Sequence, residues 1–383
     1  MLILFHILLS NPIFFDHHYY PEGVAMINFF NGLQCFRGPL AAVLTIVCFA
    51  CMSFAKTDVP VFLLSGQSNM TGYANSSGLT ADQKKTVDNV KIYMDLVWEG
   101  DAAKLRKWLT LGPGFGSNAN NIGPELFLGR TLSDSLPGKK IALIKCSSGS
   151  TYLGKASDWL PPSSNNGTGG TLYKRMVNSI DVALKSFNTA FDTAQYTPRW
   201  AGFIWLQGEF DAYDINLSNA YKTNLTNLIN DIRSQLKVAD LPAIIPMIDA
   251  QKQWTNYTIV RAAEVAVTTT LKNVDTLDTK GFPTDGTHYT GPGQVKIGIV
   301  TAQRWLNMHF NYSPAVAVAR EYSFPQVSQA QTFVAPLSPA MLFDLSGRKI
   351  GNADRPFPSN GIFIRVVKQT GKLQGYGIRA PGK

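Results

Sequence analysis

Short apolar runs alternate with amphipathic patterns between residues 59 and 310. Continuous apolar runs are typical of strands that are buried on both faces of a parallel sheet. The predicted strands are Val61–Leu64, Val90–Tyr93, Ile141–Lys145, Ala201–Trp205, Ala243–Met247 and Val274–Leu277. Between them, apolar residues recur every three or four positions over 172–187 and 217–236, which predicts two amphipathic helices. A third helix is expected to open at Gly123-Pro124-Glu125, with the proline near its first turn.

The alternation of strands and helices predicts an α/β fold. We expect a three-layer α/β/α sandwich around a doubly wound parallel sheet. Sheets of this kind bind ligands at the edge where the strands end. Long Gly- and Asn-rich stretches at 111–122 and 161–170 interrupt the pattern, and loops of this length often shape a site.

The pattern changes at the amino terminus. Residues 1–55 are predicted to be a signal peptide region, because the apolar run Pro39–Met52 is followed by small residues suited to cleavage after Ala55. A membrane anchor is the alternative, since the run approaches the length needed to span a bilayer. We expect Met26 to be the true start, which makes residues 1–25 a mis-assigned extension.

The pattern changes again after residue 310. Residues 56–310 are predicted to form the main domain, 311–335 a linker and 336–383 a small β module with strand-like alternation. Basic residues are concentrated in this module, so most of the formal net charge of +9 lies outside the main domain. We therefore expect no nucleic-acid site in the main domain. The module is either a solvated extension or a contact for an acidic surface.

Composition and cysteine placement agree with an ordinary globular core. The chain is 45% hydrophobic and 16% charged, which excludes a disordered protein. Cys35, Cys48 and Cys51 fall in the predicted signal region, which leaves only Cys146 in the mature chain. No internal disulfide is expected, and Cys146, inside an apolar run, is expected to be a buried packing residue.

A serine follows directly after the first predicted strand, in Gly66-Gln67-Ser68-Asn69-Met70. Its place at the end of a strand makes Ser68 a candidate nucleophile at the ligand edge of the sheet. The alternative is that Ser68 merely caps the following helix, as serine often does.

A second stretch, Asp285-Gly286-Thr287-His288, supplies a candidate base. An Asp three residues before a His can accept the proton on one ring nitrogen, which leaves the other nitrogen free to take a proton from a serine. His309 lies in the following helix and is expected to be structural. The alternative for His288 is a turn residue without a chemical role.

A third stretch, Trp205–Asp211, follows another apolar strand. The side-chain amide of Gln207 and the backbone N–H of Gly149, in the turn after Cys146, are candidate donors to an oxyanion. Glu209 and Asp211 suggest an alternative, the carboxylate pair of a glycoside hydrolase. No Cys/His cluster with metal-ligand spacing occurs in the mature chain, so no metal site is expected.

Together, Phe62–Met70, Trp205–Asp211 and Asp285–His288 resemble three blocks of the SGNH hydrolase superfamily, the GDSL-like esterases. They are similar in particular to carbohydrate esterase family 6 and its sialate O-acetylesterase relatives. The resemblance implies a flavodoxin-like sheet order and a serine esterase that needs no cofactor. It also implies a set of site residues: Ser68 as nucleophile, His288 as base, Asp285 as the group that orients it, the Ser68 and Gly149 amides with Gln207 as the oxyanion hole, and Gln67, Asn69 and Glu209 as supporting residues. Two departures from the family pattern, Ser150 and Phe210, are expected to reshape the pocket.

The expected function is that of a secreted acetylesterase that acts on acetylated plant polysaccharide, with xylan as the leading substrate and sialate or pectin as alternatives. With Phe343-Asp344-Leu345-Ser346-Gly347-Arg348-Lys349, the C-terminal module resembles the β modules of secreted bacterial polysaccharide-degrading and gliding-type secretion proteins. This resemblance implies export to the surface, periplasm or medium and contact with secretion machinery. No stable membrane insertion is expected after cleavage. A general lipase is a further alternative, because the order Ser, Asp, His is shared. The last alternative is a non-catalytic carbohydrate-binding protein, with Trp98, Trp108 or Trp159 stacked on sugars.

Overall fold

A computed structural model describes residues 56–310 and, nearer the C-terminus, the backbone of 341–343, 349–352, 362–369 and 372–379. The predicted signal peptide region (1–55) and linker (311–335) lie outside the described residues. By its internal contacts the chain divides into two units, residues 1–325 and 326–383.

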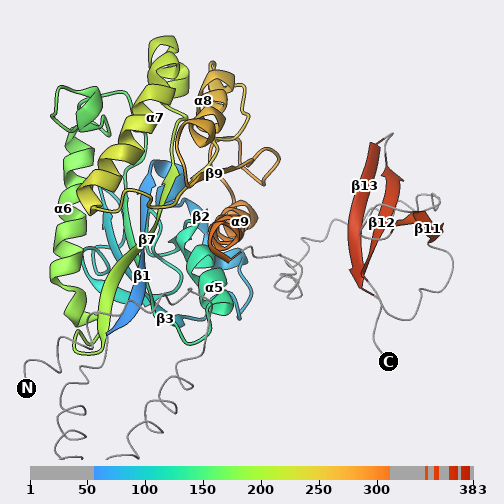
Figure 1. Ribbon diagram of the computed structural model, residues 1–383, viewed down its shortest axis with the longest axis horizontal. Helices are drawn as coiled ribbons and strands as arrows, with labels where there is room; N and C mark the ends of the chain where they lie inside the picture. The colour runs from blue at the N-terminus through green and yellow to red at the C-terminus, as the bar shows by residue number, and fades with distance from the viewer. Residues whose placement is uncertain (1–55, 311–340, 344–348, 353–361, 370–371, 380–383) are drawn as a thin grey trace, which may run out of the picture. The chain divides into compact units, whose positions relative to one another are not determined.

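A seven-stranded sheet forms the centre of the larger unit, in the order β4-β3-β6-β1-β7-β8-β9 (Figure 1). Its strands are β1 (Thr57–Gly66), β3 (Val87–Leu96), β4 (Trp108–Leu111), β6 (Ile141–Ser147), β7 (Tyr196–Leu206), β8 (Ala243–Pro246) and β9 (Val274–Leu277). All neighbouring strands pair in parallel except β3 and β4. Each predicted apolar run falls on one of the parallel strands, although β1, β3 and β7 extend several residues beyond the predicted bounds. The antiparallel edge strand β4 was not predicted, because four residues with a polar member carry too little pattern.

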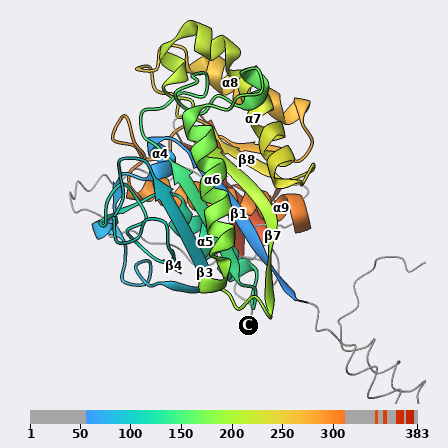
Figure 2. The ribbon, with the colours of Figure 1, turned by 90° about the vertical axis from the view of Figure 1, so that its left-hand side faces the viewer.

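Helices cover both faces of the sheet. They are α5 (Glu125–Ser135), α6 (Thr171–Lys185), α7 (Ile215–Leu236), α8 (Tyr257–Thr270) and α9 (Gly291–Phe310). Alternate residues of β1 belong to two separate hydrophobic cores. Val61 and Leu63 belong to the core beneath α6, α7 and α8. Phe62 and Leu64 belong to the core beneath α5 and α9. Figure 2 shows α6 crossing the sheet on one face. The expected three-layer α/β/α sandwich is therefore confirmed.

The strand order departs from the flavodoxin-like order that the resemblance implied. Numbered among the parallel strands only, the observed order is 2-3-1-4-5-6, whereas flavodoxin-like sheets have 2-1-3-4-5. The difference arises because β6 lies between β3 and β1. As a result β1 is flanked by β6 and β7, the strands that precede the other two loops of interest.

Short elements lie at the edge where the parallel strands end and in the connections. They are α4 (Ser68–Thr71), β2 (Ala74–Asn75), β5 (Asn121–Ile122), and the 3₁₀ turns η1 (Ser76–Gly78), η2 (Pro162–Ser164), η3 (Phe187–Thr189) and η4 (Asp211–Tyr213). None of the helices in the described part of the chain combines the length and apolar character needed to cross a bilayer.

The ends of β1, β6 and β7 are level with one another. Gly66 pairs with Ser147 of β6 and with Leu206 of β7. Gly66 has φ of +147°, and a Cβ there would lie 2.0 Å from the Leu206 carbonyl oxygen. Only glycine allows this approach, which brings the loops after the three strands together.

Cys146, near the end of β6, is a fully buried free cysteine, as predicted. Burial raises the pKa of its thiol to about 12, so the thiolate needed for nucleophilic chemistry does not form near neutral pH.

The smaller unit contains a four-stranded antiparallel sheet in the order β11-β10-β12-β13. Its strands are β10 (Met341–Phe343), β11 (Lys349–Asn352), β12 (Ile362–Gln369) and β13 (Lys372–Arg379). The first three fall on segments with the predicted strand pattern, whereas glycines at 375 and 377 weaken that pattern in β13.

Candidate active site

Ser68 is the first residue of α4, at the end of β1, and is 8% exposed. The residue in the capping position is Gln67, and no side chain accepts a cap hydrogen bond there. The alternative that Ser68 merely caps the helix is therefore wrong. Because the first N–H groups of a helix have no partner within it, the Ser68 amide can donate to a bound group.

Glu209, in the loop after β7, holds the residues on both sides of Ser68. Its two carboxylate oxygens accept hydrogen bonds from the side-chain amides of Gln67 and Asn69, the second at 2.7 Å. Burial raises the pKa of Glu209 to about 7, and the bonds from Asn69 and Gln67 act in the opposite direction. The supporting role expected for these three residues agrees with this geometry, because they fix the backbone that carries Ser68.

Asp211 fixes the backbone of the loop after β6, as Glu209 fixes the backbone around Ser68. Its carboxylate accepts the backbone N–H groups of Leu153 and Gly154 at 2.8 and 2.9 Å, and the Gln207 amide at 2.7 Å. Burial raises the pKa of Asp211 to about 6 despite these bonds. Glu209 and Asp211 are thus buried and engaged in separate networks, which contradicts the alternative of a glycoside hydrolase pair that flanks a substrate.

The expected role of Gln207 in the oxyanion hole is wrong for this structure. Its side chain is fully buried, and its NH₂ group donates to the Thr151 carbonyl at 2.8 Å as well as to Asp211. With both hydrogens used, none remains for an oxyanion. Tyr221 donates to the Gln207 side-chain oxygen at 3.1 Å, so Gln207 joins β7 to the loop after β6 and to α7.

Gly149 lies beside Ser68, as predicted. A Cβ built on Gly149 would be 3.7 Å from the Ser68 Cβ, 3.2 Å from the Tyr73 hydroxyl and 2.9 Å from the nearer Glu99 carboxylate oxygen. Ser68, Tyr73 and Glu99 therefore surround one small space that a larger residue at 149 would fill. The Gly149 backbone borders that space, which agrees with a role for its N–H in the oxyanion hole.

His288 ends an exposed turn between β9 and α9. The Asp285 carboxylate accepts the backbone N–H groups of His288 at 2.7 Å and Thr287 at 2.9 Å. Its slight burial alone would raise the pKa of Asp285, but these hydrogen bonds outweigh it and lower the pKa below its usual value. Asp285 is therefore a carboxylate near neutral pH, held within three residues of His288 by the turn itself.

Tyr289 fixes this turn against the Ser68 loop. Its backbone N–H donates to the Asn69 side-chain oxygen at 3.1 Å, and its hydroxyl bonds Thr279 at 2.8 Å. Thr279 in turn donates to the Met247 carbonyl at 2.7 Å. The residue after His288 thus contacts the residue after Ser68, so both candidate residues lie at the same edge of the sheet.

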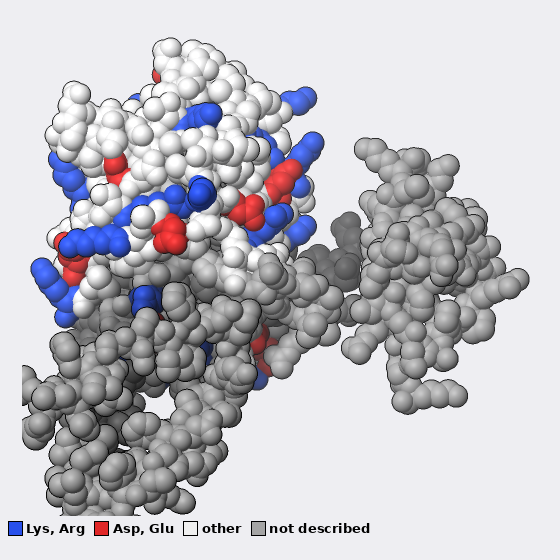
Figure 3. Space-filling view, in the orientation of Figure 1, with Lys and Arg blue, Asp and Glu red and all other residues white. Residues whose placement is uncertain are grey.

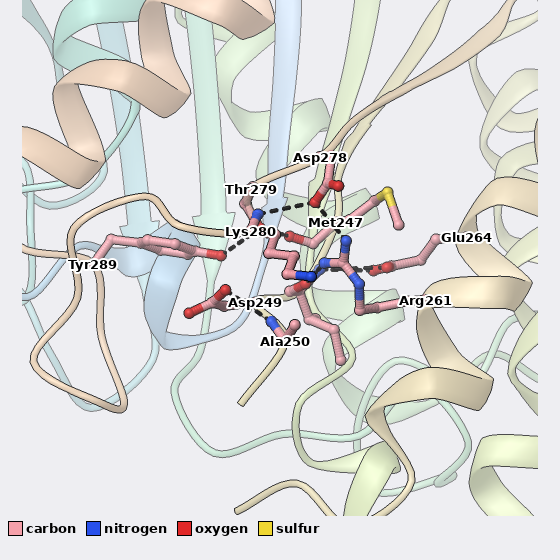
Figure 4. Close-up of polar contacts among 10 residues, drawn as sticks. Met247, Asp249, Ala250, Arg261, Glu264, Asp278, Thr279, Lys280 and Tyr289 are labelled. Carbon is pink, nitrogen blue, oxygen red and sulfur yellow. Dashed lines mark hydrogen bonds and ion pairs between the residues drawn. The ribbon is translucent and has the colours of Figure 1, made fainter. Parts of the chain in front are cut away.

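Figure 4 shows the polar network behind Tyr289, where the ends of β8 and β9 meet α8. Arg261 of α8 donates to the Ile248 carbonyl and to the Asp278 carboxylate. Glu264, one turn further along α8, accepts the Ile248 N–H, and burial raises its pKa well above the usual value. These contacts fix the segments that pack behind Tyr289, although the turn that precedes Tyr289 is exposed.

Tyr73 covers the imidazole of His288. The two rings are stacked with centroids 4.5 Å apart and an interplanar angle of 5°. Burial lowers the pKa of His288 below its usual value, and the charge of Asp285 opposes this only in part. The imidazole is therefore neutral near pH 7, as a general base must be.

Within residues 56–309, no hydrogen bond joins the His288 ring to Ser68 or to the Asp285 carboxylate. The structure thus brings the three predicted residues to one edge but does not link their side chains directly. In unliganded enzymes such catalytic bonds are often long and tighten when substrate binds.

A buried ion pair under the Ser68 loop was not predicted. The Lys145 ammonium donates to the Glu125 carboxylate at 2.7 Å and to the carbonyls of Thr71 and Phe115 at 2.8 and 2.7 Å. Neither charged side chain is exposed. Thr71 is the last residue of α4, so this pair supports the short helix that begins with Ser68. The signal for it was a lone lysine in an otherwise apolar strand, since a buried lysine needs a partner.

Among residues 56–309 no three His, Cys, Asp or Glu side chains converge as the ligands of a metal ion would. The chemistry that the described residues offer at this edge is a serine hydroxyl, an imidazole, a carboxylate and two backbone amides. This set is suited to acyl transfer.

The chain is similar to proteins that are described as carbohydrate esterases. The chain is 27% identical over 263 residues to "Probable carbohydrate esterase At4g34215" of Arabidopsis thaliana, across 64% of this chain and 90% of the relative. The X-ray structure of that Arabidopsis protein is similar with a TM-score of 0.52 and 24% identity, over 65% of this chain and 98% of the other. A carbohydrate acetylesterase from Xanthomonas citri is more distant, with a TM-score of 0.49 and 15% identity over 83% of this chain and 71% of the other.

The sequence profile of one family matches residues 58–307, which is most of the larger unit and includes Ser68, Glu209, Asp285 and His288. The family is described as "Carbohydrate esterase, sialic acid-specific acetylesterase". The fold and the arrangement of the three loops agree with this match. The chain belongs to this family of carbohydrate acetylesterases.

Proposed function

We propose that the protein is a secreted serine esterase that removes acetyl groups from an acetylated plant polysaccharide, with acetylated xylan as the leading substrate. The observation that carries this proposal is the double role of Asn69. Its side chain bonds both Glu209 and the backbone N–H of Tyr289, which joins the Ser68 loop to the turn that carries His288. Membership of the family supports an acetylated carbohydrate as substrate.

In the proposed reaction, the Ser68 hydroxyl oxygen attacks the acetyl carbonyl carbon and its proton passes to His288. The oxyanion accepts hydrogen bonds from the backbone N–H groups of Ser68 and Gly149, and loss of one such donor typically costs about 100- to 1000-fold. The bond to the sugar oxygen then breaks, and His288 returns its proton to that oxygen. Water attacks the acetyl-enzyme, His288 takes its proton, and acetate leaves as Ser68 regains a hydrogen. Asp285 stabilises the imidazolium.

The pH profile follows from the base. Because only neutral His288 can accept the serine proton, and burial lowers its pKa below about 6.5, activity should persist in slightly acidic solution and fall at lower pH. A profile that stays flat down to about pH 4 would contradict His288 as the base.

The test is acetate release from acetylated xylan, acetylated pectin and O-acetylated sialic acid, together with an activated acetyl ester such as 4-nitrophenyl acetate. Ser68→Ala is expected to lower kcat by at least about 10⁴-fold on every substrate. The matched control is Ser234→Ala, which changes an exposed serine near the C-terminal end of α7 and should retain full activity. Full activity in Ser68→Ala would end the proposal.

The same panel separates the other functions. Preference for O-acetylated sialic acid would select a sialate O-acetylesterase, which the description of the family favours. Preference for long acyl chains in a series of 4-nitrophenyl esters would indicate a lipase. Binding of acetylated oligosaccharides without acetate release would indicate a non-catalytic protein.

Export is a separate part of the proposal and has its own test. Cleavage after Ala55 predicts Lys56 as the first residue of the mature protein. N-terminal sequencing of protein recovered outside the cytoplasm should find this residue. Recovery of the uncleaved chain in a membrane fraction would favour the anchor instead.

A further inference from the structure

We propose that Trp98, Glu99 and Tyr73 form the wall of the site that binds the sugar ring, and that this wall selects uncharged sugars over sugar acids. The inference rests on the proposed esterase function and names the substrate class of the same site. Trp98 and Glu99 follow β3, and Tyr73 follows α4, so all three lie at the ligand edge of the sheet.

Large apolar side chains are exposed mainly at this edge. Among the described residues, Tyr73, Trp98, Tyr213 and Ile215, the first residue of α7, follow the ends of β1, β3 and β7, whereas Val182 and Val265 lie within α6 and α8. Exposed aromatic side chains at a ligand edge indicate a binding surface. An extended chain of sugars presents flat C–H faces that such rings can cover.

Trp98 is the most exposed of these side chains, at 97%. Its backbone φ is +64°, a conformation that residues other than glycine rarely adopt. An indole held away from the core in a strained turn is better explained by a ligand than by packing. Trp108 and Trp159, the other candidate sugar platforms, are buried in the core beneath α6.

Glu99 offers an unused acceptor beside the serine. One carboxylate oxygen accepts the Tyr73 hydroxyl, while the other is shielded from solvent and has no hydrogen-bond partner among residues 56–309. A buried acceptor without a partner is unfavourable, so a donor from a ligand is expected to complete it. The hydroxyl groups of a sugar are donors of this kind.

The Glu99 oxygen nearest to Gly149 is the one that accepts the Tyr73 hydroxyl, and the unpaired oxygen belongs to the same carboxylate. The Glu99 carboxylate, the Tyr73 hydroxyl and the Ser68 Cβ all lie within 4 Å of one point beside Gly149. We therefore place the hydroxyl next to the acetylated position of the sugar beside this wall.

The charge of Glu99 sets the class of sugar. A sialic acid or galacturonic acid unit would bring its own carboxylate close to this one, and like charges repel strongly where water is excluded. Burial raises the pKa of Glu99, and the hydrogen bond from Tyr73 and the charge of Lys145 oppose this only in part, so alkaline solution favours the charged carboxylate. The Lys145 ammonium is fully buried and donates to Glu125, Thr71 and Phe115, so it cannot pair with a substrate. On the face drawn in Figure 3, the Lys and Arg side chains of the described residues lie among Asp and Glu side chains and form no continuous basic track.

The first test compares kcat/KM for acetylated xylo-oligosaccharides and acetylated oligogalacturonides of equal length at pH 8, each divided by the value for 4-nitrophenyl acetate with the same variant. We expect the full-length protein to favour the neutral substrate. Glu99→Gln keeps the shape but removes the charge, and should reduce that preference about tenfold. Asp134→Asn, an exposed change on α5 with the same charge difference, should leave the preference unchanged. An unchanged preference in Glu99→Gln would overturn the inference.

A binding measurement separates this inference from the esterase proposal. Titration of Ser68→Ala protein with the two acetylated oligosaccharides should give tighter binding of the neutral one. The double variant Ser68→Ala, Trp98→Ala should raise its Kd about tenfold. If 4-nitrophenyl acetate is not hydrolysed, the esterase proposal fails. The binding preference is still tested, because this titration does not depend on hydrolysis. Equal or tighter binding of the acidic oligosaccharide would refute the sugar wall.

Discussion

The two halves of the candidate site are built in opposite ways. Ser68 lies in a loop whose neighbours, Gln67 and Asn69, are each 1% exposed and bonded to a carboxylate from another strand end. His288 lies at the end of an exposed turn that is held by hydrogen bonds of its own backbone to Asp285. The proposed nucleophile is thus positioned by long-range side-chain contacts, whereas the proposed base is positioned by a local turn and by Tyr289 behind it.

Stability and activity should therefore respond differently to substitution in the two halves. Substitutions around the nucleophile leave buried polar groups without partners, so they should cost folding free energy as well as activity. Substitutions in the turn affect groups that water can reach, so they should cost activity alone. Four variants test this contrast.

The largest expected effect is that of Asp285→Asn. The Asn oxygen can still accept the His288 N–H and keep the turn, but the charge that stabilises the imidazolium is lost. We expect kcat to fall roughly 10³- to 10⁴-fold, while the free energy of unfolding changes by less than about 1 kcal/mol. Steady-state kinetics and urea unfolding measure the two quantities. A large loss of stability would show that the turn is structural, contrary to the contrast.

Lys145→Met should have the largest effect on stability. It leaves Glu125 charged and buried without its partner, and breaking a buried pair in this way costs about 3–5 kcal/mol. The double variant Lys145→Met, Glu125→Gln should recover part of this loss, because the uncompensated charge is removed. The free energies of unfolding of wild type, both single variants and the double variant measure the coupling. Additive losses would mean that the pair contributes nothing as a pair.

Glu209→Gln is expected to have a smaller effect on stability, about 2–3 kcal/mol, because its new NH₂ group would face the amide of Gln67 or Asn69 without an acceptor. Activity should fall with it, since both neighbours of Ser68 are released. The sign of the pH dependence provides a second readout. Burial raises the pKa of Glu209 to about 7, above its unfolded value near 4.5, so its contribution to stability is lost as pH rises through that range. The variant should show a weaker decline of stability over the same range.

The smallest expected effect is that of Tyr73→Ala, which uncovers one face of the His288 ring. Burial lowers the pKa of His288, so exposure should return the pKa toward its usual 6.5 and move the acid limb of kcat/KM to higher pH by less than about one unit. Tyr73→Phe keeps the stacked ring and should keep the limb in place. If the acid limb of the kcat/KM profile lies at the same pH in both variants, the stacked ring of Tyr73 does not affect the pKa of His288.

Much of the fold could be predicted because its central strands are buried on both faces. Runs such as Val61–Leu64 and Ala201–Trp205 carry continuous apolar sequences that few other structures require. The edge strand β4 lacked that signal, and the strand order followed from packing that no local pattern records. For example, no local sequence pattern shows that β6 lies between β3 and β1 in the sheet.

The position of Ser68, Asp285 and His288 at one edge of the sheet could be predicted, whereas their reacting roles stay a prediction and the residues that support them were predicted less well. Ser68, Asp285 and His288 stood out because each follows a strand or forms a short turn of recognisable chemistry. Gln207 was assigned the wrong role, because a sequence does not show that Thr151 and Asp211 take both amide hydrogens. The position of Glu99 beside Ser68 was not predicted, because no local sequence pattern shows which residues of distant loops become neighbours.

The hydrogen bond between Asn69 and Tyr289 joins residues 220 positions apart in the chain. A growing polypeptide therefore completes its sheet centre long before its imidazole arrives beside the serine. Proteolytic fragments that end before Asp285 lack the proposed base as well as α9, which covers one face of the sheet, and should show no turnover. Acetate release can thus serve as a gauge of whether every part of this domain, from its first strand to its last helix, has been synthesised and assembled.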